Sequence, residues 1–553
     1  MIAERRRSTS GQTRIPSLHR KGSRVLVGID GEDFTAQSRL DQIGSGLYLW
    51  ILVLCIGGAN MAESLEMGSV APIHSALART FGLSHDQRSS LPLITFGGSA
   101  IGLLFSGPIC DWRGRKIALQ LSLVTIALVM FTTALLPNNT NPTLVLSLRF
   151  LSGFAGAVQL PAGCVLAVES SPAEYRSWVV FGITLMGAIG YFVEALAVEH
   201  YMPSFGEEPT DHWRTYCYVV GGASLCTMPF MYWLQESPLF LAMNGNAKGC
   251  VAALDNIARM NGKPPSNVEA AQRLGQEREQ RSEEPGDRMQ RAPSFGRRKS
   301  LIELAATPWT SWVLFIIMML SVLDSCRSFM VTGSAYLWKD LFMLVEGQLM
   351  SPARLNVISS VAPIVGLLIS VQLLCIGVRR LAFVAAMVAG MAFVGLSSAS
   401  VRTDAGKLLI CIVAVKSTYG SLGTCTNLIK AESFPTELRA SGFGIVSVVA
   451  KVVGMLASTL VESLKANETA DSWDDATLRG YILSLLAAIV SFAILVVMVP
   501  GQTGEGKMLD DFIRPKVMRP SAATYGATAT WDESTDSDDV DGSRALRTYS
   551  LPP

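Results

Sequence analysis

The sequence has 553 residues, of which 49% are hydrophobic and 16% are charged, and its net charge is +1. Soluble domains carry about 25% charged residues, so the composition excludes an ordinary soluble domain and indicates a polytopic membrane protein. A net charge this close to zero gives no reason to expect nucleic acid as a partner.

The N-terminal segment, residues 1–46, is polar and basic and contains no apolar core. It does not fit a cleaved secretory signal, so we expect the first apolar run, from Tyr48, to remain as a membrane helix. More runs follow, each of about 20 apolar residues and long enough to cross a bilayer as a helix. They begin near Leu91, Ile117, Leu144, Val179, Tyr216, Trp309, Val357, Leu381, Leu408, Gly442 and Tyr481.

The runs predict an all-α polytopic membrane protein with about twelve transmembrane helices in two pseudo-symmetric six-helix bundles. Its predicted parts are a cytoplasmic N-terminal segment (1–46), a first bundle (47–234), a cytoplasmic linker (235–308), a second bundle (309–500) and a cytoplasmic tail (501–553). The orientation follows from the positive-inside rule, because Lys and Arg concentrate in the N-terminal segment and the linker. The sequence leaves open whether the membrane is a plasma or a vesicle membrane.

An eight-residue pattern occurs twice, as Glu169–Arg176 and as Glu432–Arg439, with identities at Glu, Ser, Pro, Glu and Arg. The copies are 432 − 169 = 263 residues apart. A repeat of this length indicates a duplicated half-protein, because solenoid repeats have periods of a few tens of residues. The two copies therefore locate equivalent halves of the chain.

A second motif, Gly107–Lys116, joins the second and third apolar runs. Asp111 is placed to accept backbone N–H bonds at the start of the following helix, and Gly114 permits a tight turn. An ordinary positive-inside loop is the simpler interpretation, but an aspartate, a glycine and three cations within six residues favour a specific role.

This loop resembles the signature between helices 2 and 3 of the major facilitator superfamily, with Trp112 in place of the usual first arginine. Arg149–Gly153 and the two octapeptides resemble the ends of helices 4 and 10 in that superfamily. Gln235–Leu241 and Asn60–Met67 make the chain similar to the branch of organic-ion carriers and synaptic-vesicle glycoproteins, which is related to sugar porters. The corresponding loop of the second half, Cys375–Arg380, lacks the aspartate, which argues against two symmetric inner gates.

The resemblance implies alternating access, in which two bundles rock about a central site. The inner gate would then consist of Asp111, Arg113, Gly114, Arg115, Lys116, Glu169, Arg176, Glu432 and Arg439. The alternative is that these residues only anchor helix ends in the headgroup layer.

Charged residues inside apolar runs are costly unless paired or wetted, so they indicate function. Glu63 and Glu66 are three residues apart and share one helix face. A rise of about 1.5 Å per residue puts Glu63 and Arg149 at similar depths, roughly 10 Å below the outer surface. We therefore expect Arg149 to pair with a carboxylate and to couple proton movement to transport, as an acid in the first helix does in related proton-linked carriers. The alternative is a static pair in a uniporter.

The second half supplies further candidates for substrate binding. In organic-ion carriers the position of Lys451 is acidic in cation carriers and basic in anion carriers, which favours an anionic or neutral substrate here. Asp324 is expected to pair either with Arg327 or with Lys451. Lys416 lies in the predicted tenth helix. Aromatic candidates for the cavity wall include Tyr191 and Tyr419.

These features predict a transporter of a small anionic or neutral organic solute, either proton-linked or facilitative. Two alternatives stay open: an organic-cation carrier, if Glu63 and Glu66 face the substrate, and a non-transporting binding or regulatory protein on the same scaffold. The expected partners are a small-molecule substrate, membrane lipid and, in the coupled case, protons. No nucleophile triad or phosphate loop occurs and the ten cysteines are scattered, so we expect no enzyme, no cofactor and no metal site.

Overall fold

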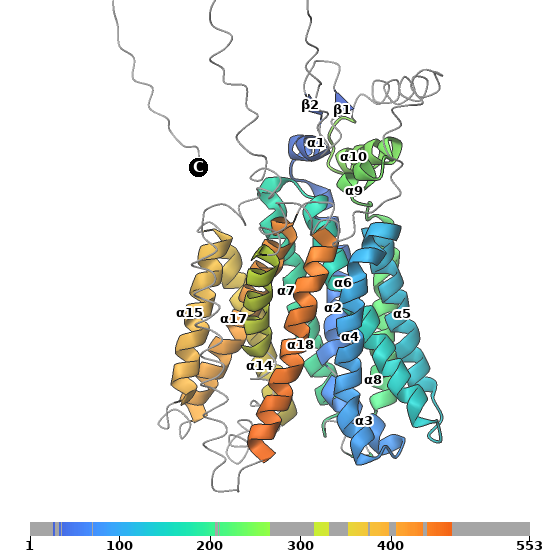
Figure 1. Cartoon of the computed structure of the whole chain (residues 1–553), viewed down its shortest axis with the longest axis vertical. Helices are drawn as coiled ribbons and strands as arrows, with labels where there is room; N and C mark the ends of the chain where they lie inside the picture. Colours follow the sequence, from blue (N-terminus) through green and yellow to red (C-terminus); the bar gives the residue numbers. More distant parts are fainter. Residues whose placement is uncertain are drawn as a thin grey trace, which may run out of the picture. The chain divides into compact units, whose positions relative to one another are not determined.

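The computed structural model describes residues 26–27, 33–34, 36–68, 70–204, 208–209, 211–265, 315–330, 352–373, 377–397, 405–434 and 439–466 (Figure 1). They all belong to one compact unit, Met1–Leu509. We call residues 36–265 the first half and residues 315–466 the second half. The predicted run from Tyr481 lies outside the described residues.

Eleven long helical segments in the described part account for eleven of the predicted runs. Those of the first half are α2 (Leu47–Gly68), α4 (His85–Arg113), α5 (Arg115–Leu135), α6 (Pro142–Glu169), α7 (Arg176–Tyr201) and α8 (Trp213–Thr227). Those of the second half are residues 315–330, α14 (Pro352–Gln372), α15 (Val378–Ser397), α17 (Ala405–Ser433) and α18 (Arg439–Ala466). The all-α, multi-pass prediction is confirmed, since seven described helices are long and apolar enough to cross a membrane.

Shorter elements lie at the ends of these helices. They are β1 (Leu26–Val27), β2 (Asp33–Phe34), α1 (Ala36–Ile43), α3 (Val70–Thr80), η1 (Ala173–Tyr175), η2 (Pro229–Tyr232), α9 (Pro238–Met243) and α10 (Ala247–Met260). The two strands form an antiparallel pair in which Leu26 faces Phe34. Helices α1, α9 and α10 gather at one end of the bundle, and α3 lies at the other (Figure 1).

Local sequence explains where several helices begin. Ser84 and Gln87 form a capping box at the start of α4, so that each side chain satisfies a backbone N–H of the other. Asn141 caps α6 by accepting from Thr143 N at 2.9 Å, and Pro142 occupies the first turn, where a missing N–H costs nothing.

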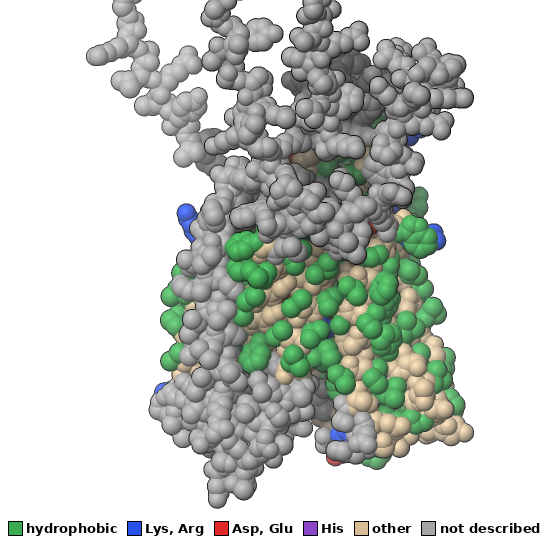
Figure 2. Space-filling view, in the orientation of Figure 1, with side chains coloured by type: hydrophobic (Ala, Val, Ile, Leu, Met, Phe, Trp, Pro, Cys, Tyr) green, Lys and Arg blue, Asp and Glu red, His purple; other side chains and the backbone are tan. Residues whose placement is uncertain are grey.

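The helices pack so that the two halves meet along two seams. Within the first half α4 packs on α6 and α2 packs on α7, while within the second half α17 packs on α14 and α15. Between the halves, α18 packs on α4 and α14 packs on α7. On the described part of the surface in view, hydrophobic side chains are widely spread and few charged side chains lie among them, as expected for a lipid-facing surface (Figure 2). The candidate site therefore lies along the seams.

Candidate functional site

A buried ion cluster joins the two halves at the end that carries α9. Its centre is Glu169, the last residue of α6, whose side chain is fully buried. Its carboxylate lies 3.2 Å from Arg115 Nε and 3.1 Å from Arg439 Nη1. The hydroxyl of Ser237, the cap of α9, donates to it at 2.6 Å. Because Arg439 is the first residue of α18, this cluster ties the second half to the first.

Asp111 extends the contact between α4 and α18. Its Oδ1 lies 3.6 Å from Arg115 Nη2, and its Oδ2 accepts from Ser441 Oγ at 3.3 Å. The backbones approach closely here, because a Cβ on Gly107 would lie 2.5 Å from the Cα of Ser441. A Cβ on Gly444 would likewise lie 2.5 Å from a backbone oxygen of α4. The seam is therefore closed at this end.

Three further predicted gate residues lie around the cluster. Arg113 is exposed and stacks on the neighbouring Trp112 ring, with its guanidinium carbon 4.2 Å from the ring centre. Lys116 donates to the backbone oxygen of Leu234 at 2.5 Å. Glu432, the counterpart of Glu169, is fully buried at the end of α17. Arg113 therefore points away from the cluster, whereas Lys116 fastens α5 to the segment before α9.

Arg176 connects the first octapeptide to the short helix α1. Its Nε donates to the carbonyl of Val168 at 3.1 Å, and its Nη2 donates to Gln37 Oε1 at 2.7 Å. On the same helix, Asp41 accepts from the backbone N–H of Ala173 at 2.9 Å. Helix α1 thus holds the turn between α6 and α7, a role that the polar appearance of residues 1–46 does not indicate.

Glu236 caps α5, the role that the sequence assigns to Asp111. Its carboxylate accepts from the backbone N–H groups of Arg115 at 3.0 Å and Lys116 at 3.2 Å. Gly114 makes room for it, since its φ is 98° and an added Cβ would meet the Glu236 carboxylate. Burial raises the pKa of Glu236, although these hydrogen bonds act in the opposite direction.

The predicted ion pair between Arg149 and a glutamate of α2 is not formed. Arg149 donates from Nη2 to Thr133 Oγ1 at 3.0 Å. The hydroxyl of Ser152, rather than Arg149, donates to Glu66 Oε1 at 2.6 Å. Among the described residues, Arg149 forms no ion pair with a carboxylate. Counting along helices gave the depth of each residue but not the face from which its side chain points.

Lys451 is near enough to the glutamates of α2 for their charges to interact. The charge of Lys451 acts on Glu63. The charges of Glu63 and Glu66 act on Lys451 more strongly than the charge of Asp324 does. Its ammonium lies 5.0 Å from the centre of the Phe96 ring of α4. Lys451 belongs to α18, so charges of the two halves meet within the membrane-spanning part of the seam.

Asp324 pairs with Arg327, one of the predicted alternatives, and with Lys430, which the sequence analysis did not select. Arg327 Nε lies 2.8 Å from Oδ1, and Lys430 Nζ lies 2.8 Å from Oδ2. Lys430 is 1% exposed in α17. It lies near the end of α17, 430 − 405 = 25 residues from the first residue of that helix.

The charges of Lys416 and Glu194 influence each other across the two halves without a direct ion pair between these two described residues. Lys416 donates to Ser359 Oγ of α14 at 2.5 Å, and its charge also acts on Glu194 of α7, which is 4% exposed. Glu194 was not among the residues predicted from the sequence. The same signal that found Glu63 would have found it, because it is a carboxylate within an apolar run.

Tyrosines and a small cavity complete the surroundings of these charges. Tyr191 is 43% exposed, and charges from both halves act on it, including Glu63 and Arg327. Tyr419 donates its hydroxyl to the Met330 carbonyl at 3.0 Å. Tyr191 therefore lies where the halves face each other, whereas Tyr419 fastens α17 to the helix at 315–330.

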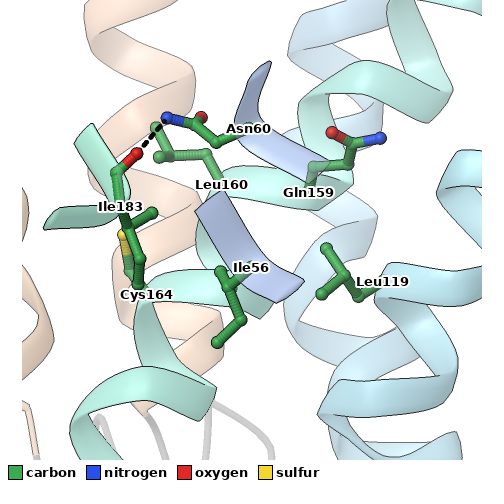
Figure 3. A pocket seen from close by; sticks show the side chains of 8 residues that line it. Ile56, Asn60, Leu119, Gln159, Leu160, Cys164 and Ile183 are labelled. Carbon is green, nitrogen blue, oxygen red and sulfur yellow. Dashed lines mark hydrogen bonds between the residues drawn. The ribbon is translucent and has the colours of Figure 1, made fainter. Parts of the chain in front are cut away.

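Figure 3 shows the small cavity, which lies between α2, α5, α6 and α7 and measures about 10 Å³. Asn60 donates across it to the Ile183 carbonyl at 3.2 Å, and the amide of Gln159, which is 3% exposed, has no hydrogen-bond partner in the described part of the chain. A space of this size holds about one water molecule and no organic solute. No group of three potential metal-binding side chains occurs in the described ranges.

Comparisons with known proteins agree with this architecture. Residues 64–505 match the family model described as sugar (and other) transporter. The chain is 28% identical over 233 residues to the rat synaptic vesicle 2-related protein, covering 42% of this chain and 41% of that protein. It is 31% identical over 232 residues to the 4-hydroxybenzoate transporter PcaK of Acinetobacter baylyi, covering 40% of this chain and 47% of that protein. The alignments thus span less than half the length of these relatives.

A solved structure shows the same fold. The major facilitator superfamily proton:xylose symporter XylE, bound to 6-bromo-6-deoxy-D-glucose, superposes with a TM-score of 0.64 at 16% sequence identity. The match covers 84% of this chain and 97% of the symporter. The predicted resemblance to the superfamily is confirmed, and the matched family, PcaK and XylE are described as transporters rather than enzymes, as expected.

Proposed function

Because this chain belongs to the sugar (and other) transporter family, we propose that it carries a small organic solute across a membrane by alternating access. The observation that carries the proposal is the ion pair between Glu169 and Arg439, which joins the two halves at one end of the bundle. A carrier that opens to each side in turn needs such a contact, made in one state and broken in the other.

The cluster around Glu169 is the inner gate of this proposal, and the end with α1, α9 and α10 is cytoplasmic. Both assignments follow from the cations that flank these helices under the positive-inside rule. Alternating access then requires α4 and α18 to separate at Asp111 and Ser441 while the first and second halves rotate about the central charges. The described structure corresponds to the state closed to the cytoplasm.

An anionic solute fits the charges of the central seam. Arg327, Lys430, Lys451 and Lys416 all lie on the second half, where Asp324 is the carboxylate that pairs with two of them. Support also comes from the relative whose name gives 4-hydroxybenzoate, a carboxylate, as its solute. We propose that this chain carries a small organic anion.

We further propose that Glu63 and Glu66 couple transport to protons. Neither needs Arg149 as a fixed partner, and Lys451 of the opposite half acts on both. If the halves separate, the glutamates lose this cation, and proton binding becomes more favourable. The structural neighbour XylE is named as a proton:xylose symporter, which agrees with this proposal.

An organic-cation carrier is the second candidate, favoured by the partial exposure of Glu63 at the seam. Uptake into proteoliposomes separates the candidates, using matched panels of organic anions, neutral solutes and cations with and without a pH gradient. We expect accumulation of an anion that increases when the outside is acidic. Preference for cations would contradict the anionic assignment, and uptake indifferent to the gradient would contradict coupling. A reconstituted protein that moves no solute would favour the non-transporting alternative.

A further inference from the structure

Asp324 binds two cations inside the second half. The carboxylate is 1% exposed, and it lies 2.8 Å from Arg327 Nε on one oxygen and 2.8 Å from Lys430 Nζ on the other. One negative charge between two positive charges leaves this group with a net positive charge. Such a charge is costly in a buried place unless an anion offsets it. The group therefore favours the arrival of an anion.

Lys430 has no capacity left to bind that anion. Besides Asp324, it donates to Ser447 Oγ at 3.0 Å, and its ammonium lies 4.3 Å from the centre of the Phe443 ring. An ammonium group has three hydrogens, so the carboxylate, the hydroxyl and the ring satisfy it. Its role in the structure is to hold Asp324.

Arg327 is arranged differently. Its side chain is 24% exposed, and its only hydrogen bond to the described residues uses Nε and Asp324. The hydrogens on both Nη atoms remain as donors in the fork that matches a carboxylate. Gly423 leaves space beside the guanidinium, since an added Cβ would stand 3.7 Å from Nη1.

The position of Arg327 also fits a solute-binding role. Its charge acts on Tyr191 of α7 and on Lys451 of α18, so it faces the seam between the halves. Lys451 is less suited to receive the anion, because Glu63 and Glu66 already act on its charge. Arg327 combines partial exposure with a planar fork of donors that are not in use among the described residues.

We propose that Arg327 is the receptor for the carboxylate of the transported solute, and that Lys430 positions it by holding Asp324. This inference rests on the proposed transport function and narrows the solute to small organic carboxylates. It assigns recognition of the solute's negative charge to Arg327, whereas the sequence favoured Lys451 for this role. Lys430 is a positioning residue that does not touch the solute.

The test compares acids with their neutral amides, namely nicotinate with nicotinamide and 4-hydroxybenzoate with 4-hydroxybenzamide. Binding to the purified full-length protein and uptake into proteoliposomes are both measured. We expect the wild-type protein to prefer the acid over the amide. Arg327→Gln should lower that preference about ten- to hundredfold and leave amide binding unchanged, because only the acid loses charged hydrogen bonds to the guanidinium. Arg327→Lys should fall between the two, since it keeps the charge but loses the fork.

Lys430→Gln tests the positioning role. It should raise the KM for the acid about tenfold or more with little change for the amide, and Lys430→Arg should restore most of the affinity because it keeps a cation beside Asp324. Lys407→Gln, an exposed lysine on the same helix, is the matched control and should change neither value.

The outcomes distinguish this inference from the proposed function. A wild-type protein that carries an acid, together with an Arg327→Gln variant that keeps the full preference for it, overturns the receptor role alone. Equal losses for acid and amide in the Lys430 variant would assign that residue to general stability and overturn its positioning role. Absence of acid uptake by the wild-type protein, alongside uptake of other solutes, overturns the carboxylate assignment. Absence of all uptake contradicts the transport function itself.

Discussion

Removing the guanidinium of Arg439 tests whether the ion cluster closes the end of the bundle that we propose to be cytoplasmic. Arg439 and Glu169 are both fully buried, 3.1 Å apart, so Arg439→Gln leaves one partner of a buried ion pair. Breaking such a pair costs about 3–5 kcal/mol. Arg115 remains 3.2 Å from Glu169 and offsets part of this cost, so we take about 1.5–3 kcal/mol as the loss in the closed state. That corresponds to a roughly ten- to hundredfold shift towards the open state.

The shift is measurable as the reactivity of a cysteine placed in the seam. Ala440 lies beside Arg439, is fully buried, and packs against hydrophobic residues of the first half. In an Ala440→Cys background, maleimide labelling from the cytoplasmic side should be at least tenfold faster with Arg439→Gln than with the native arginine. Arg113→Gln is the matched control, because Arg113 is exposed and should leave labelling unchanged. Equal labelling rates with and without Arg439 would refute the gate interpretation.

Three further predictions concern the seams and the end of the bundle that carries α9. Gly444→Leu should open the same seam by wedging α18 from α4 and should raise labelling at residue 440, because an added Cβ would already stand 2.5 Å from a backbone oxygen of α4. Glu194→Gln should reduce uptake, because the charges of Glu194 and Lys416 act on each other. The double variant Glu194→Gln, Lys416→Met should transport no worse than Lys416→Met alone, because the loss of either charge removes the same interaction. Burial raises the pKa of Glu236 in the folded protein, so the stability it contributes is fully present below about pH 4.3 and is lost as the pH rises through the folded-state value.

Each of these predictions has a direct control. For the seam, Gly222→Leu places the same side chain where nothing lies within 4 Å, and equal effects on labelling would contradict the wedge. For the charge pair, additive losses in the double variant would show that the two residues act independently. For Glu236, the Tm advantage of the wild type over Glu236→Gln should shrink from pH 4 to pH 8, and an advantage that grows with pH would contradict the raised pKa.

The sequence predicted the fold well because hydrophobic length is a local property. Each run of apolar residues predicts one spanning helix. The repeated octapeptide predicted which helices of the two halves correspond, and this prediction needs no information on how the helices pack. The short helices α1, α9 and α10 were not foreseen. They pack against each other, and the burial of Leu40 and Leu254 depends on contacts between segments distant in sequence.

The candidate site was predicted less completely, for a geometric reason. Counting along helices gave depths that placed Arg149 beside Glu63, but the direction of a side chain depends on how the helices pack, and Arg149 turned to Thr133 instead. Ion pairs between helices distant in sequence, such as Lys430 with Asp324, leave no spacing signal in the chain. Residues joined through a local motif, such as Asp111 and Arg115, were identified because the motif itself carried the contact.

Counterflow in proteoliposomes tests the central claim most directly. Vesicles loaded with an unlabelled organic acid that the wild-type protein carries are diluted into the labelled acid, and labelled entry is followed without a pH gradient or membrane potential. Alternating access through one central site predicts that internal acid accelerates labelled entry above the rate in empty vesicles. Labelled entry that is the same in loaded vesicles, empty vesicles and vesicles without protein would contradict the account.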